Sequence, residues 1–470
     1  MKRLIALLLA LALVFALAAC GGGSSEDKTE QNESVEPAKE ESASTETPSA
    51  DTTETEQTTE SEETAETASK PYPHCNEDGT PNLDKIANFD IDYDYTQNEK
   101  FKIAYVASSS YFLYQGAADA IESWAPLFNL EWLGFFFNND GDSNSYMTIL
   151  QQVLDSGVDL LILDPDNTIF PTVTQLLSQY PDVKWMPMMS ASRDGATGDG
   201  VPMGGYKTHP YVGFNDQETG YALTEMLYSW LKENYPDADP AEVGCIAFDY
   251  SISPALHARA VACEKKWKEI AGESADNFWL VDCASTGINY EGAKSVFPGE
   301  IANHSEIKYW LIDGILDDWA LAAADTLDEA GLTDTSCCVT FGGTGFIQQW
   351  DAGINNAARL ALATAQTLYD EPIIGAVYAF KMGWCTEEEI WPSWVNPEDC
   401  GDGTHQYSSL LLPVLWLSPD DYIPFLKWSD IYGNTSIYSY LKGYDEVEVA
   451  YDAYSPFVST YPDYYTGPRD

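Results

Sequence analysis

Polar and aromatic residues follow several short apolar runs of this 470-residue chain, each directly after a run ends. Carboxylates and amides exchange hydrogen bonds with hydroxyl groups, arginine donates through a rigid fork, and aromatic faces cover apolar C–H surfaces. This mixture suits reversible binding of a neutral polyhydroxy molecule, without covalent chemistry. The residues that we expect to contact such a ligand are Tyr111, Phe112, Asp166, Asn167, Arg193, Asn215, Asp216, Arg259, Asp317, Asp318, Thr344 and Gln348.

Some of these residues have an ordinary structural interpretation as well. An aspartate ahead of a helix commonly caps it, so Asp317 and Asp318 are equally expected as N-caps. Tyr111 and Phe112 could instead pack in the core or form a hydrophobic staple. Both interpretations stay open from the sequence.

From residue 101, short apolar runs alternate with helical patterns. FKIAYVAS at 101–108 predicts a strand buried on both faces, and YQGAADAIESWAPLF at 114–128 places its apolar residues at helical spacing. The next predicted strands are 130–137, 158–165 and 183–190, with helices at 145–157 and 169–181 between them. This alternation predicts a parallel sheet with helices on both faces.

A second series of the same kind begins near residue 209. Its predicted strands are HPYVGF, EVGCIAF, FWLVDCAS, IKYWLIDG and SCCVTFGG, again separated by helical patterns. The roughly 400 residues that follow residue 70 exceed what one hydrophobic core usually supports, so two lobes are expected. Ligands of parallel sheets bind outside the carboxyl ends of the strands, where the polar residues described above are expected to lie.

Five segments resemble one known family, the type I periplasmic binding proteins, which include the sugar-binding lipoproteins of ATP-binding-cassette importers. They are FKIAYVASSSYFLYQGAADAIE, ILQQVLDSGVDLLILDPDN, YVGFNDQETGYAL, SPALHARAVACEKKW and LIDGILDDWALAAADTLDEAGL, and the resemblance spans about residues 101–421. It implies an α/β fold with two similar doubly wound parallel-sheet lobes joined by a hinge. The implied N-terminal lobe comprises 101–213 and 344–383, and the C-terminal lobe 214–343 and 384–428.

The resemblance also assigns roles to residues. It implies that Asp166 or Asn167 contacts ligand, that Arg259 clamps ligand hydroxyls, and that Asp317 takes the place of a ligand aspartate. The chain departs from the family pattern where Asn215 precedes Asp216 in reversed order. It also lacks the Asp or Asn usual after Phe341, and Thr344 or Gln348 is the expected substitute. The segment 192–209 and the Tyr-rich extension 429–470 are additions.

The N-terminus resembles a bacterial lipoprotein signal. Lys2 and Arg3 precede an apolar run that ends in Leu17-Ala18-Ala19-Cys20, so we expect a signal peptide at 1–19 and a diacylated Cys20. Residues 20–70 then form an acidic tether, predicted to be disordered because it is poor in apolar residues, and 71–100 are a lead-in segment. This predicts a protein anchored by lipid alone on the extracellular face of the cell membrane. An ordinary signal peptide with an incidental cysteine is the alternative.

The net charge of the chain argues against some classes of binding partner, and its cysteines bear on disulfides and metal sites. The formal net charge of −52, from 23 Lys and Arg against 75 Asp and Glu, argues against nucleic acid and anionic lipid surfaces as partners.

Cys245 and Cys283 lie in apolar runs and are expected as packed thiols, whereas Cys385 and Cys400 could close a loop. Without a C-x-x-C motif and with five His, no zinc site or other cofactor is expected. The Asp90-x-Asp92-x-Asp94 pattern lacks the later residues of a calcium loop.

Three functions compete. A monomeric solute-binding protein that delivers a sugar, polyol or nucleoside to a membrane permease fits the sequence best. A sensor whose closed form signals to a membrane partner uses the same residues, and the sequence does not separate the two. An enzyme with paired carboxylates is the weakest reading, because no nucleophile elbow or phosphate-binding loop occurs.

Overall fold

The computed structural model divides the chain into two units, Met1–Glu66 and Thr67–Asp470. The described residues are 70–110, 112–138, 143–165, 167–189, 191–195, 205–363, 367–395, 406–412, 414–450 and 453–454. Everything below concerns the second unit. The predicted signal peptide, Cys20 and most of the tether lie outside the described residues.

The first sheet is parallel, with strand order β2-β1-β3-β4. Its strands are β1 (Lys102–Ala107), β2 (Glu131–Phe137), β3 (Leu160–Asp164) and β4 (Lys184–Pro187), and the helices between them are α2 (Phe112–Trp124), α3 (Ser143–Asp155) and α4 (Phe170–Leu177). Alternate residues of β1 enter different cores: Ile103 and Tyr105 on one face, Ala104 and Val106 on the other. This two-sided burial explains the continuous apolar run in the sequence.

A short pair of strands extends this lobe. β5 (Tyr211–Gly213) pairs in parallel with β11 (Ser409–Leu411), and Val212 forms a parallel bridge with Met188 just after β4. β11 comes from a distant part of the chain, so the lobe is completed by two separate segments.

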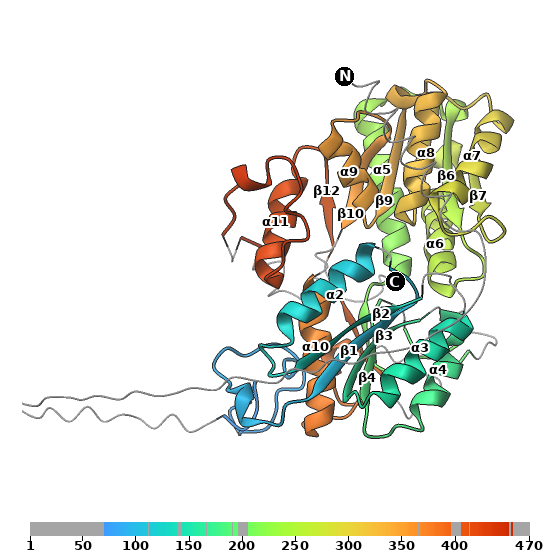
Figure 1. Cartoon of the computed structure of the whole chain (residues 1–470). Coiled ribbons are helices and arrows are strands. Elements are labelled where there is room, and N and C mark those ends of the chain that lie inside the picture. The colour runs from blue at the N-terminus through green and yellow to red at the C-terminus, as the bar shows by residue number, and fades with distance from the viewer. Residues whose placement is uncertain are drawn as a thin grey trace, which may run out of the picture. The chain divides into compact units, whose positions relative to one another are not determined.

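The second sheet has six strands in the order β12-β10-β9-β8-β6-β7. Its strands are β6 (Val243–Asp249), β7 (Phe278–Asp282), β8 (Tyr309–Gly314), β9 (Ser336–Phe341), β10 (Ala358–Ala363) and β12 (Leu415–Leu417), of which only β12 is antiparallel to its neighbour. The helices are α5 (Asp216–Asn234), α6 (Pro254–Ile270), α7 (Tyr290–Asn303), α8 (Asp317–Glu329) and α9 (Thr344–Ala352). Figure 1 shows α5 and α6 in green, and α7 and α8 in yellow to orange, around the central strands.

The lobe boundaries differ from those expected after residue 343. Strand β10 pairs with β9 in the second sheet, so 344–363 belong to the second lobe rather than the first. The chain returns to the first lobe only with α10 (Thr367–Met382), which packs on α2, β3 and β4. After β11 it crosses again to β12. The reason is strand pairing over long range, because β10 finds its parallel partner in β9 and not in the first sheet.

The lead-in segment is folded onto the first lobe. Phe89 and Tyr95 stack with ring centroids 5.4 Å apart, and Tyr95 meets Phe128 and Tyr378 edge-on at 5.0 and 5.6 Å. Gly375 of α10 allows close contact there, since a Cβ at this position would lie 1.7 Å from the carbonyl oxygen of Ala87. Residues near 90 therefore complete the core under α10.

The cysteines are consistent with the packed thiols expected. Cys245 and Cys283 are buried and free, as are Cys263, Cys337 and Cys338. Cys385 is also free in the structure, and its predicted partner Cys400 lies outside the described residues. Burial raises the pKa of Cys283 to about 11, so this thiol is held in its protonated, unreactive form.

None of the helices in the described part of the chain has the length and hydropathy needed to cross a bilayer. Nor do the described side chains form a group of three or more His, Cys, Asp or Glu that could hold a metal ion.

Candidate functional site

A partly buried ion pair lies where β5 leads into the second lobe. Asn215 caps α5 by accepting a 3.0 Å hydrogen bond from the backbone N–H of Glu218, which leaves Asp216 as the first helical residue. Nε of Arg259 on α6 donates to Oδ1 of Asp216 at 2.7 Å. The two helices approach closely because a Cβ on Gly220 would lie 2.3 Å from the carbonyl oxygen of Arg259. The expected ligand residues Asp216 and Arg259 are thus partners of each other.

Two further contacts hold the Arg259 guanidinium in place. One of its terminal nitrogens donates to the carbonyl oxygen of Ile315 at 3.1 Å, just after β8. The guanidinium carbon Cζ of Arg259 lies 4.5 Å from the centroid of the Phe341 ring at the end of β9, close enough for a cation–π contact. Phe341 in turn meets Phe214 edge-on, with centroids 4.5 Å apart. Ion pair, carbonyl and ring together fix the orientation of this donor.

Asp317 is the first residue of α8, two residues after Ile315, whose carbonyl oxygen accepts from Arg259. Its Oδ2 accepts a 2.5 Å hydrogen bond from the backbone N–H of Gly345 near the start of α9. The N-cap of α9 is Gly343, at φ 93°, which has no side chain to perform that task. Asp317 therefore caps a neighbouring helix, which the sequence did not indicate.

The second oxygen of Asp317 is unused. Oδ1 is buried and has no hydrogen-bond partner among the described residues. Burial raises the pKa of Asp317 to about 7, and the hydrogen bond from Gly345 opposes this rise. A buried acceptor without a donor is costly, so a ligand hydroxyl that reached it would be favoured.

The remaining predicted residues of the second lobe are less constrained. Asp318 is half-buried beside Asp317, and burial raises its pKa. Thr344 is half-buried at the first position of α9, whereas Gln348 is exposed one turn later. Of the two expected substitutes for the missing aspartate, Thr344 is therefore the one next to the Asp317–Gly345 contact.

The first lobe is only partly open to assessment. Tyr111 and Asp166 lie outside the described residues. Phe112 is the first residue of α2, and Asn167 opens a 3-10 helix, Asn167–Ile169, after β3. The structure describes the side chains of neither.

Arg193 lies in the segment between β4 and β5. Its backbone forms an antiparallel bridge with Lys207, which precedes β5, and its guanidinium donates to the carbonyl oxygen of Gly205 at 2.7 Å. The Nζ of Lys207 donates to the carbonyl oxygen of Tyr407 before β11 at 2.8 Å. The contact of Arg193 with ligand stays a prediction.

Solved structures share this architecture. The chain aligns with a glucose-galactose binding protein, GanP, from Geobacillus stearothermophilus, with TM-score 0.50 and 10% identity, over 69% of this chain and 99% of that one. A galactofuranose binding protein aligns with TM-score 0.50 and 13% identity, over 71% and 99%. LsrB from Clostridium saccharobutylicum, in complex with AI-2, aligns with TM-score 0.51 and 15% identity, over 68% and 98%. No protein-family model and no curated protein matches the sequence.

This chain has the type I periplasmic-binding-protein fold. The two parallel sheets, the chain crossings between them and the neighbours' architecture agree on that point. These neighbours are binding proteins rather than enzymes. At such low identity they establish the fold alone, so the ligand must be argued from this chain's own residues.

Within the type I fold, a second polar group follows β6 and β7 and is not among the predicted site residues. Nδ1 of His257 on α6 lies 2.9 and 3.0 Å from the two carboxylate oxygens of Asp249. Asp282 accepts from the hydroxyl of Ser251 at 2.7 Å and from the backbone N–H of Ala284 at 2.9 Å. His257 lies in the first turn of α6, the helix that follows β6, and this place after a strand was the available signal.

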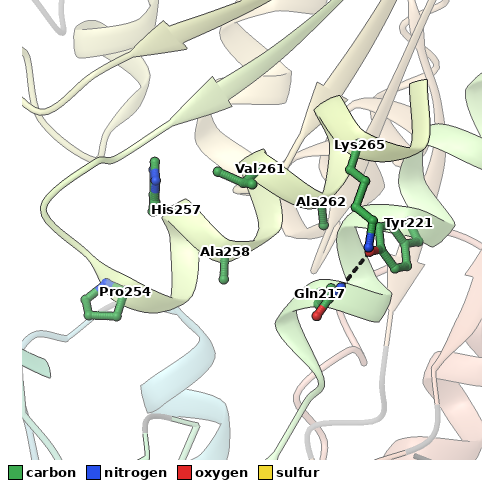
Figure 2. Close-up of a pocket in the computed structure, with 8 residues that line it drawn as sticks. All are labelled: Gln217, Tyr221, Pro254, His257, Ala258, Val261, Ala262 and Lys265. Atoms are coloured by element: carbon green, nitrogen blue, oxygen red, sulfur yellow. Dashed lines mark hydrogen bonds between the residues drawn. The ribbon is translucent and has the colours of Figure 1, made fainter. Parts of the chain in front are cut away.

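The described residues also line a cavity of about 310 Å³ between α5 and α6. Figure 2 shows its lining, with the side-chain amide of Gln217 donating to the hydroxyl of Tyr221 beside Lys265. Asp216, Arg259 and Asp317 are absent from that lining. The cavity is a groove between helices and is distinct from the Arg259 cluster.

Proposed function

We propose that the chain is an extracellular solute-binding lipoprotein that captures a small polar, sugar-like ligand between its lobes for an ATP-binding-cassette importer. The supporting observation is the cluster at the carboxyl ends of β8 and β9. There, the oriented Arg259 donor lies over the Phe341 ring and bonds the carbonyl of Ile315, and Asp317, two residues further along, has a buried oxygen without a hydrogen-bond partner among the described residues.

The chemistry of this cluster favours an uncharged ligand. The charge of Arg259 is offset by Asp216 at 2.7 Å, and Asp317 has a pKa of about 7, so neither supplies a strong unpaired charge. Directed donors, an acceptor and an aromatic face suit hydroxyl groups on a ring with apolar C–H surfaces. Closure of the lobes would bury such a ligand, and the closed form would be the one that a permease recognises.

A panel of monosaccharides, polyols and nucleosides tests the proposal by thermal unfolding of the protein. At a ligand concentration one hundred times the dissociation constant, one member should stabilise the protein by about 2.7 kcal/mol. Asp317→Asn keeps an oxygen that accepts from the Gly345 N–H but replaces the unpaired Oδ1 by an amide NH₂. It should therefore weaken the stabilisation by the ligand. Asp328→Asn, on the exposed end of α8, is the matched control and should leave the response unchanged. A flat response across the panel contradicts sugar-like binding.

The lipid anchor is a separate proposal with its own test. Cys20→Ser should remove the acylated residue, so the protein should move from the membrane fraction to the medium or stay unprocessed. Ser24→Ala changes a nearby residue without touching the thiol and should remain membrane-bound. Fractionation and lipid labelling measure both, and a labelled Cys20→Ser protein would exclude this anchor.

The alternative is a sensor that uses the same closure to signal to a membrane partner. The ligand panel does not separate it from transport. Uptake of the ligand by cells that lack the protein would separate them, since a sensor is not required for the uptake step itself.

A further inference from the structure

The C-terminal extension contacts both lobes. Strand β12 of the second sheet leads directly into α11 (Tyr422–Gly433), and the chain continues through turns to residue 446. We call residues 421–446 the strap. Its start is joined covalently to the second lobe, so contacts that it makes with α2 and α10 connect the lobes outside the hinge.

Contacts with the first lobe are numerous, and they range from exposed at Ser123 to buried at Thr367. The hydroxyl of Ser123 on α2 donates to the carbonyl oxygen of Asn434 at 2.8 Å, and the side-chain amide of Asn434 donates back at 3.0 Å. The hydroxyl of Thr367 at the start of α10 donates to the carbonyl oxygen of Ser429 at 3.0 Å. The hydroxyl of Tyr432 donates to the carboxylate of Glu371. The strap is thus fixed to the first lobe at the point where α10 leaves the hinge.

Contacts with the second lobe are fewer, and comprise a buried ring contact and an exposed polar contact. Tyr422 lies beside Trp350 of α9, with ring centroids 5.6 Å apart. The backbone N–H of Lys442 donates to Oδ1 of Asp351 at 2.6 Å, and its ammonium donates to the Asp351 carbonyl oxygen. The Lys442 side chain is 72% exposed, so this contact can break without burying a charge.

The strap is internally rigid, which allows it to transmit force. The buried Asp430 carboxylate accepts hydrogen bonds from the hydroxyls of Thr435 and Tyr444 and from the backbone N–H groups of Ile437 and Tyr438, at 2.8–2.9 Å. Lys427 donates to the carbonyl oxygen of Tyr444 at 2.7 Å. These bonds fold the segment after α11 back onto the helix. Tyr438 and Tyr444 of the extension therefore serve its packing.

We infer that the strap is a latch on lobe rotation, fixed to α2 and α10 and held to α9 by Lys442 and Asp351. Rotation of the second lobe about the hinge moves α9 relative to α10. Because the strap is fixed to the first lobe at Thr367 and Ser123, it cannot move with α9 and with α10 at the same time. Its weaker contact, with Asp351 on α9, therefore opens. The latch thereby sets the balance between open and closed lobes, whatever the ligand is.

The test measures the distance between lobes in the ligand-free protein. Spin labels are attached through a ketone-bearing unnatural amino acid at Gln152 on α3 and Ser295 on α7, both exposed, which spares the native cysteines. Double electron–electron resonance then gives the populations of the two lobe arrangements. Lys442→Met should change their ratio about threefold, because an exposed ion pair contributes about 0.6 kcal/mol.

A matched control and a second variant keep the test decisive. Lys308→Met breaks an exposed pair with Glu242 inside the second lobe and should leave the distances unchanged. Tyr422→Leu removes the ring contact with Trp350 and should shift the ratio in the same direction as Lys442→Met. Distances that match wild type in both strap variants overturn the latch, as does a shift of equal size in Lys308→Met. No ligand is needed, so the outcome is independent of the proposed solute.

Discussion

Arg259→Met should abolish the stabilisation produced by the best solute of the panel and lower the free energy of unfolding by about 2 kcal/mol. The substitution removes the oriented donor and leaves the Asp216 carboxylate and the Ile315 carbonyl without their partner. Losing a hydrogen bond to a charged group costs about that much. Thermal unfolding with and without the solute measures both effects.

Arg359→Met is the control for this experiment. Arg359 lies on β10 of the same lobe and donates to the carbonyl oxygen of Thr333 at 2.9 Å, away from the cluster. Its loss should reduce stability while the solute response remains. Arg259→Lys keeps the charge but not the planar fork, and should recover only part of the response. A full response in Arg259→Met would show that the ligand binds elsewhere.

Stability should fall as the pH rises from about 4 to 7, and Asp313→Asn should remove a large part of that fall. Asp313 on β8 is fully buried, and burial raises its pKa from 3.8 to about 7. The folded state therefore holds a proton that the unfolded chain releases, so the stabilising effect present in acid is lost as the pH approaches 7. The difference between the two pKa values corresponds to about 4 kcal/mol.

The comparison of wild type and Asp313→Asn isolates this group. General repulsion among the 75 acidic residues also weakens the fold at high pH, but it is common to both proteins and cancels in the difference. Asp317 should also lower the free energy of unfolding as the pH rises, because burial raises its pKa in the same way. Urea unfolding at pH 5, 6, 7 and 8 measures the profiles. Parallel profiles would mean that Asp313 is ionised in the folded protein.

The surroundings of Asp313 explain why a carboxylate is tolerated there. Its Oδ2 accepts from the hydroxyl of Thr224 at 3.0 Å and from the thiol of Cys245 at 3.4 Å. Oδ1 has no hydrogen-bond partner among the described residues. One of the two carboxyl oxygens of Asp313 therefore has hydrogen-bond donors, and the neutral form of the group avoids the desolvation cost of a buried charge. The apolar IKYWLIDG run indicated the strand but not the protonation of its aspartate.

Local patterns were sufficient for most of the architecture. Runs such as FKIAYVAS and EVGCIAF became β1 and β6 because a strand buried on both faces must be apolar throughout. The same logic placed Asp216 and Asp317 at the carboxyl edge, since parallel strands bring their ends together. The pairing of β10 with β9, which moved 344–363 to the second lobe, depended on contacts that no local pattern records.

The sequence by itself determined the alternation of strands and helices, the two lobes and the type of residue after each strand, because these follow from short-range periodicity. Only the tertiary structure decided what those residues do. It pairs Arg259 with Asp216, uses Asp317 to cap α9 and folds residues 421–446 into the strap. The physical reason is that partners far apart in the chain meet only after the sheets have packed, so their hydrogen bonds leave no trace in local spacing.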